Sequence, residues 1–141
     1  MPIDYEKLLN WHIPEVAQTY TQRDTMLYAL GVGAASRAED THELKFVYEA
    51  QLQALPMMAV TLGYPGLWMS DPATGIDWKR MLHGEQGLEI FRPLPTHGSV
   101  IGRTSVSEIW DRGEGKGAIV RAKRDVIDAQ SGELLCRLSI T

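Results

Sequence analysis

The last third of the sequence alternates between apolar and polar residues over three long segments, residues 98–110, 117–128 and 133–141. In the last of them, "ELLCRLSIT", every second residue is apolar: Leu134, Cys136, Leu138 and Ile140. The middle segment places four small or apolar residues on one face: Ala118, Val120, Ala122 and Val126. A period of two is typical of strands with one buried face, and the glycine-containing stretches "DRGEGKG" and "DAQSGE" are typical of hairpin loops. The pattern predicts an antiparallel meander of long, curved strands with one helix packed on its concave face.

The first half of the chain gives weaker signals. A short helix is predicted after Thr21, which can cap it together with Asp24, and Gly31 or Gly33 can end it. Three of its apolar residues lie at helical spacing and are expected to face the core: Met26, Leu27 and Leu30.

Two further stretches complete the predicted domain. The alternating residues "ELKFVYE", 43–49, predict a strand. Residues 1–20 are expected to form an irregular N-terminal arm, so that residues 1–141 make one domain, a length that supports a core without metal or disulfide.

Residues 51–81 combine large apolar side chains with three prolines that interrupt any long helix: Pro56, Pro65 and Pro72. The large apolar side chains are Met57, Met58, Trp68, Met69, Trp78 and Met81. They either fill the core or line an adaptable apolar cleft, because methionine packs loosely and changes shape easily. The pattern leaves both interpretations open.

The stretch "LHGEQGLEIFRPLP", residues 82–95, places His83 and Glu85 two positions apart. On a strand both side chains point to the same face, where they could form an acid–base pair or the polar rim of a pocket. The sequence has no HxH, HExxH or CxxC pattern, so we expect neither a metal nor another cofactor. Cys136 is expected to be a buried, inert thiol.

Composition limits the possible partners and compartment. A net charge of −4 argues against nucleic acid, and a strand face explains the one basic cluster, Arg121-Ala122-Lys123-Arg124. No apolar run reaches the roughly 20 residues of a membrane span, so no membrane partner is expected. The single cysteine and the N-terminus without a secretory signal favour a reducing compartment, so a cytoplasmic protein is expected and an organelle matrix remains open. Because the sequence stops at Thr141 within an alternating strand, we expect a further segment to follow.

Four stretches taken together carry a resemblance: "LLNWHIPEVAQTYTQRDTMLYALGVGA", "PMMAVTLG", "LHGEQGLEIFRPLP" and "DAQSGELLCRL". Their order and spacing resemble the N-terminal half of the MaoC-like, (R)-specific enoyl-CoA hydratases and dehydratases, from about Trp11 to the last residue. The resemblance implies an α+β hot-dog fold, in which a curved antiparallel sheet wraps a central helix. It also implies that two such halves form a pseudo-dimer.

The resemblance implies a division of labour between the halves. The second half carries the catalytic Asp-x-Asn-Pro-x-His element, which is absent from these 141 residues, so no catalytic residue is assigned here. The first half has a shortened central helix, here within residues 51–81, and accommodates the acyl chain of an acyl-CoA. His83 and Glu85 are then expected at the rim of the pocket. The expected substrate-binding residues are Met57, Met58, Leu62, Trp68, Trp78, Met81, His83 and Glu85.

The expected partners are an acyl-CoA and either a catalytic hot-dog half or a second copy of the chain. Two alternatives remain open. One is a catalytically silent protein that binds acyl thioesters or pairs with an active partner. The other is a stand-alone hot-dog thioesterase or dehydratase that uses a carboxylate such as Glu85 or Asp77.

Overall fold

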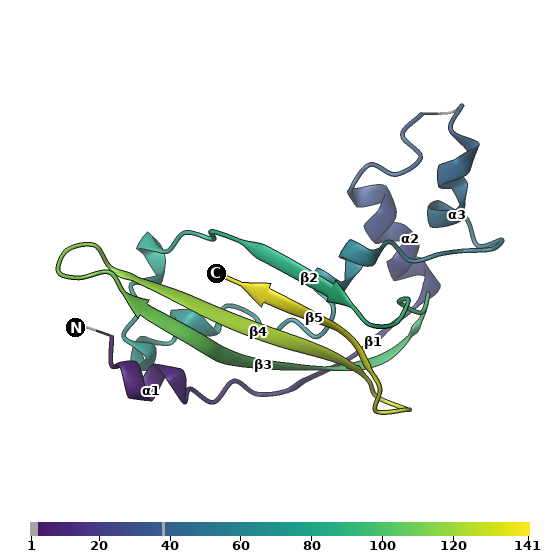
Figure 1. Cartoon of the computed structure of the whole chain (residues 1–141). Helices are drawn as coiled ribbons and strands as arrows, with labels where there is room; N and C mark the ends of the chain where they lie inside the picture. The colour runs from purple at the N-terminus through teal and green to yellow at the C-terminus, as the bar shows by residue number, and fades with distance from the viewer. Residues whose placement is uncertain (1–2, 38) are drawn as a thin grey trace.

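The computed structural model describes residues 3–37 and 39–141, and across these residues five strands form one antiparallel sheet (Figure 1). The order across the sheet is β1-β3-β4-β5-β2. The strands are β1 (Val16–Tyr20), β2 (Gln86–Ile90), β3 (Gly98–Asp111), β4 (Ala118–Asp128) and β5 (Leu134–Ile140). The long, curved hairpin of β3 and β4 continues into β5, which confirms the predicted meander.

The core lies on the concave face of the sheet, under a short 3₁₀ helix, η2 (Pro56–Thr61). Three residues in or next to η2 are buried against the sheet: Met58, Ala59 and Leu62. They pack on inward-facing side chains of β3, β4 and β5: Val100, Val126, Cys136 and Leu138. A sheet wrapped around one short helix is the predicted hot-dog fold, and the helix comes from the proline-interrupted segment.

The helix predicted after Thr21 exists as α2 (Gln22–Gly31). It begins as expected, because the Asp24 carboxylate accepts hydrogen bonds from the Thr21 N–H and O–H at 2.7 and 3.0 Å. Figure 1 shows α2 beyond one end of the sheet, beside α3 (Leu44–Val47), and not on the concave face.

The predicted core face of α2 is therefore wrong. Leu27 and Leu30 are 61% and 55% exposed and Met26 is half-buried, whereas the small residues Thr25 and Ala29 are buried. The Thr25 hydroxyl donates a hydrogen bond to the Thr96 carbonyl at 2.8 Å. The helix rests on its small residues, so its large apolar side chains project into solvent.

The predicted strand at residues 43–49 is also wrong, because this stretch is helical. The 3₁₀ helix η1 (Thr41–Glu43) begins at Asp40, whose carboxylate accepts a hydrogen bond from the His42 N–H at 3.1 Å. It runs directly into α3, which packs against α2. Periodicity alone does not separate a helix from a strand in so short an apolar run.

Of the predicted irregular arm, residues 3–20 are described, and they hold regular elements. Within them lie α1 (Tyr5–Leu9), capped by Asp4, and strand β1, which pairs with the first five residues of β3. Tyr20 ends β1 in the core, and its hydroxyl donates to the Pro95 carbonyl at 2.8 Å. Leu8 anchors α1 in a second apolar cluster with Val106 and Ile109. These elements depend on packing against β3 more than on their local sequence.

The inward face predicted for β5 is confirmed at Cys136 and Leu138, both fully buried. A shift in the register with β4 between Val126 and Ile127 buries Leu135 as well and leaves Leu134 half-buried. Three further 3₁₀ turns follow η2: η3 (Trp68–Ser70), η4 (Pro72–Thr74) and η5 (Trp78–Arg80). In the described part of the chain, every helix is too short or too polar to cross a membrane.

Candidate functional site

The segment that follows η2 crosses the concave face of the sheet with its backbone in direct contact with β3. A Cβ atom on Gly63 would lie 2.6 Å from the Cα of Gly102, closer than any real side chain can approach. Gly63 also has φ +59, a left-handed conformation that glycine adopts without steric cost, and its N–H donates to the Gln18 Oε1 at 2.7 Å. The end of η2 and the turn after it, residues 60–64, which we call the roof segment, are thus fixed on the sheet.

Arg124 lies beneath the roof segment and faces inward from the middle of β4. It is 1% exposed, and its Nη2 donates a hydrogen bond to the Val60 carbonyl at 2.6 Å. Its guanidinium carbon is 5.4 Å from the centre of the Tyr64 ring. Burial lowers the pKa of Arg124, but an arginine in a protein keeps its positive charge.

This buried guanidinium is only partly hydrogen-bonded. Within residues 3–37 and 39–141, neither its Nε nor its Nη1 has a hydrogen-bond partner, and it forms no ion pair. The Oγ1 of Thr104, its register partner on β3, is likewise buried without a partner. Burying a charge without compensation is costly, so this cluster differs from the apolar core around it.

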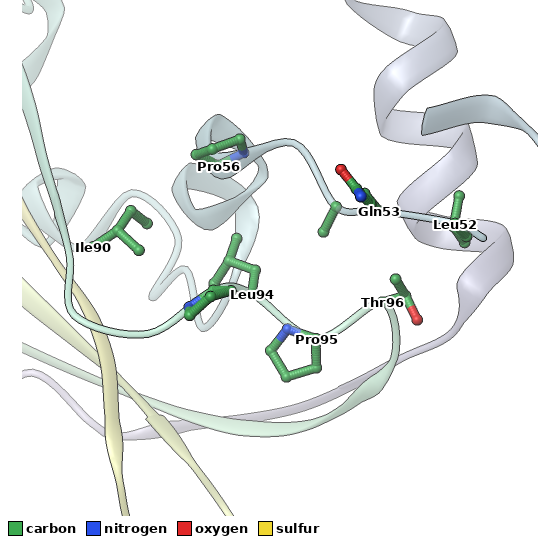
Figure 2. A pocket seen from close by; sticks show the side chains of 9 residues that line it. Leu52, Gln53, Pro56, Ile90, Leu94, Pro95 and Thr96 are labelled. Atoms are coloured by element: carbon green, nitrogen blue, oxygen red, sulfur yellow. The ribbon is translucent and has the colours of Figure 1, made fainter. Parts of the chain in front are cut away.

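A cavity of about 480 Å³ opens beside the core, between the chain before η2 and the loop from β2 to β3 (Figure 2). Nine residues line it: Leu52, Gln53, Ala54, Pro56, Ile90, Pro93, Leu94, Pro95 and Thr96. Figure 2 shows Gln53 and Pro56 on one side of the cavity and Leu94 and Pro95 on the other. Its lining is mostly apolar, and it is about half open to solvent.

The predicted substrate-binding residues are spread over several environments. Met58 and Leu62 are packed in the core against the sheet. Trp68 joins the second apolar cluster and lines an open groove beside Trp11 and His12. The others are exposed: Met57, Trp78, Met81, His83 and Glu85. None of the eight lines the cavity beside η2, so their role in binding stays a prediction.

His83 and Glu85 precede β2 at the edge of the sheet. The Gly84 N–H donates to the Thr141 carbonyl at 2.8 Å, and the Thr141 N–H donates to the Glu85 carbonyl at 3.0 Å. These bonds extend the ladder between β2 and β5 and fix the backbone of the segment. The Glu85 carboxylate is 3.8 Å from Arg121 and open to solvent, which does not favour a buried acid–base pair.

Two other sequence interpretations can be compared with the structure. The basic cluster in β4 does not lie on one face, because Arg121 and Lys123 point outward and Arg124 inward. Cys136 is fully buried, and desolvation raises the pKa of its thiol to about 11, which disfavours the nucleophilic thiolate. In the part of the chain described here, no three His, Cys, Asp or Glu side chains lie close enough together to hold a metal ion.

Sequence reasoning missed Arg124 and the cavity. The alternation that places Ala122 and Val126 inward places Arg124 inward too, so a signal for it was present in the sequence. The cavity has no such signal. It is formed by two irregular segments, residues 52–56 and 90–96, that only the tertiary structure brings together.

The curved sheet and the short helix seated on it define a hot-dog domain. Residues 18–141 match the family model of the MFE-2 hydratase 2 N-terminal domain, and the chain belongs to this family. It is similar to the peroxisomal enoyl-CoA hydratase 2 of Arabidopsis thaliana, with 40% identity over 136 residues, 92% of this chain and 43% of that protein.

Solved structures agree with this assignment. A MaoC-like dehydratase from Phytophthora capsici superposes with a TM-score of 0.74 and 30% identity, over 96% of this chain and 46% of that one. The peroxisomal multifunctional enzyme type 2 of Drosophila melanogaster superposes with a TM-score of 0.69 and 34% identity, over 89% of this chain and 22% of that one. The chain thus spans less than half the length of each of these relatives.

Proposed function

We propose that this chain is the acyl-binding half of an (R)-specific enoyl-CoA hydratase or 3-hydroxyacyl-CoA dehydratase. The observation that carries the proposal is the length of the helix on the concave face. The six residues of η2 stand where the resemblance expects a shortened central helix, and a cavity of about 480 Å³ lies next to them. An acyl chain that enters this cavity contacts mostly apolar side chains.

The catalytic groups are proposed to come from another domain or subunit. The chain has no Asp-x-Asn-Pro-x-His element, and His83 and Glu85 are exposed at the rim of the sheet. The names of the relatives, an enoyl-CoA hydratase and a MaoC-like dehydratase, support the reaction class. Asp77 and Glu85 are both exposed, which gives no support to a stand-alone thioesterase built on either carboxylate.

The chain alone is expected to leave trans-2-enoyl-CoA unhydrated, because nothing in the proposed site activates water. Mixing it with a separately produced hot-dog half that carries the Asp-x-Asn-Pro-x-His element should give a turnover of about 1 per second or more. Absorbance of crotonyl-CoA and of 2-decenoyl-CoA measures both reactions. In the mixture, Glu85→Gln and His83→Ala should change the rate only a few-fold.

Hydration by the chain alone, lost in Glu85→Gln, would contradict the proposed division of labour. Acyl-CoA binding with no turnover in the mixture would instead favour a catalytically silent binding protein. The control is the catalytic half assayed by itself. A rate of hydration that appears only in the mixture belongs to the pair.

The proposed partner is a catalytic half or a second copy of the chain, at the open edge of β2. This strand pairs only with β5 in the described sheet, and three apolar residues next to the edge are exposed: Leu82, Ile90 and Phe91. An unpaired edge beside apolar side chains favours pairing with another strand.

At tens of micromolar, the chain is therefore expected to be a dimer in light scattering. Leu82→Lys, at a residue that is 89% exposed, should shift it toward the monomer. Tyr5→Lys is the matched control, because Tyr5 is an exposed apolar residue on α1, which packs against β3, three strands away from β2. A monomeric wild-type chain, or equal effects of the two substitutions, would count against this edge.

The location of the protein stays a prediction. The sequence favours the cytoplasm, whereas the relative from Arabidopsis thaliana is named as peroxisomal.

A further inference from the structure

We propose that Arg124 receives a carboxylate at the far end of the acyl group, so that the preferred substrates are thioesters of dicarboxylic acids. This inference rests on the proposed function, because it specifies what the acyl-binding half holds. The cluster that carries it is a buried guanidinium with two free donor nitrogens, next to the free hydroxyl of Thr104 and under the Tyr64 ring.

The cluster lacks a carboxylate, the usual partner of a buried guanidinium. Its single hydrogen bond goes to the neutral carbonyl of Val60, and no carboxylate of the described chain forms an ion pair with it. The nearest acidic side chain along β4, Asp125, faces outward and is held by Arg137 at 2.6 and 2.8 Å. Nε and Nη1 lie on opposite sides of the guanidinium, so a carboxylate would pair with one of them and with the second N–H of Nη2, as Asp125 pairs with Nε and Nη2 of Arg137.

The cavity and this cluster lie on the same face of the sheet. Two rows of register partners on the inner face of the sheet connect them: Ile90–Cys136–Val126 and Leu88–Leu138–Arg124. Ile90 in the first row lines the cavity. Adjacent rows on one face lie about 7 Å apart, and β2 lies two strands, or about 10 Å, from β4, so the backbone at Ile90 is roughly 12 Å from that at Arg124. The side chains between them, Val126, Cys136 and Leu138, are fully buried in the core, so an acyl chain that continues from the cavity reaches the guanidinium only when these side chains move aside.

Part of the cover over the cluster is a side chain. Tyr64 is half-exposed, and its ring lies over the guanidinium between Gly63 and Pro65. Rotation of this ring would open the cluster without separating the backbone contact between Gly63 and Gly102. The apolar walls exclude water, which strengthens a hydrogen-bonded ion pair formed inside.

The test compares acyl-CoAs of equal length that differ only at the far end. Isothermal titration measures the affinity of this chain for decanoyl-CoA and sebacoyl-CoA, with the hexanoyl–adipoyl and dodecanoyl–dodecanedioyl pairs to find the best length. At that length the carboxylate-ended ligand should bind roughly ten- to hundredfold more tightly, as expected for a charge-assisted hydrogen bond. Arg124→Met should abolish this preference without weakening the methyl-ended ligand.

Two further variants make the result specific. Arg124→Lys keeps the charge without the planar fork and should retain part of the preference. It also carries the test if Arg124→Met fails to fold, as judged by circular dichroism. Arg103→Met removes an exposed arginine from the neighbouring strand β3, where it pairs with Glu15, and should leave the preference unchanged.

The proposal would be overturned if the wild-type chain bound the two ligands with equal affinity, or if the preference for the carboxylate survived in Arg124→Met. It would also be overturned if a folded Arg124→Met variant bound neither ligand. Length-dependent binding of methyl-ended acyl-CoAs without a carboxylate preference would overturn this inference alone. Binding of neither ligand would overturn the proposed function as well.

Discussion

Gly102→Ala is expected to lower the free energy of unfolding by about 3 kcal/mol, at the upper end of the usual cost of overpacking. A Cβ atom at this position would lie 2.7 Å from the Cα of Gly63 and overlap its carbonyl oxygen. The neighbour is backbone, which cannot rotate away as a side chain can. The roof segment would therefore have to lift from the sheet, and the core under Leu62 would open with it.

Urea unfolding followed by circular dichroism measures this loss. Gly31→Ala is the matched control, because a Cβ atom at Gly31 in α2 meets nothing within 4 Å. Alanine also has the higher helix propensity, so that variant should be as stable as the wild type or slightly more so. If Gly102→Ala matched the wild type as well, the close contact between the roof segment and β3 would be wrong.

Ala54→Trp is expected to remove binding of long acyl-CoAs and to leave short ones unaffected, because the indole ring would fill the cavity beside η2. Each methylene group excluded from an apolar site costs about 0.8 kcal/mol, or about a fourfold loss of affinity. Excluding about four of them therefore lowers the affinity more than a hundredfold. Titration of the variant with butyryl-CoA and dodecanoyl-CoA measures the effect.

The sequence predicts a different place for the acyl chain, a cleft lined by Met57 and its apolar neighbours. Met57→Trp tests this placement. Met57 lies on η2, half-exposed and outside the lining of the cavity. A loss of long-chain binding in this variant alone would place the acyl chain on the opposite side of η2. If both tryptophan variants lowered the melting temperature with unchanged chain-length preference, these residues would only fill the core.

The regular part of the fold was predictable because its signals are local. The alternation in residues 98–141 gives β3, β4 and β5, and the Thr21–Asp24 pair gives the start of α2. Strand β1 was missed because it pairs with β3, which lies about 80 residues further along the chain. Helix α3 was missed because its short run of apolar residues follows no clear helical period, and it packs against α2.

The site was less predictable than the fold. Glycines 63 and 102 lie far apart in the sequence, and nothing local indicates that their backbones touch. The position of Arg124 on the inner face follows from strand parity, but its unpaired nitrogen atoms become visible only once the roof segment is in place. The binding role of the residues chosen from composition, such as Met57 and Trp78, stays a prediction.

The central claim is that this chain alone holds the tail of an acyl-CoA. Isothermal titration with saturated acyl-CoAs of increasing length, from acetyl-CoA to palmitoyl-CoA, tests it directly. The affinity should rise about fourfold with each methylene group buried and then level off when the cavity is full. An affinity that is the same at every length, and equal to that of free CoA, would contradict it.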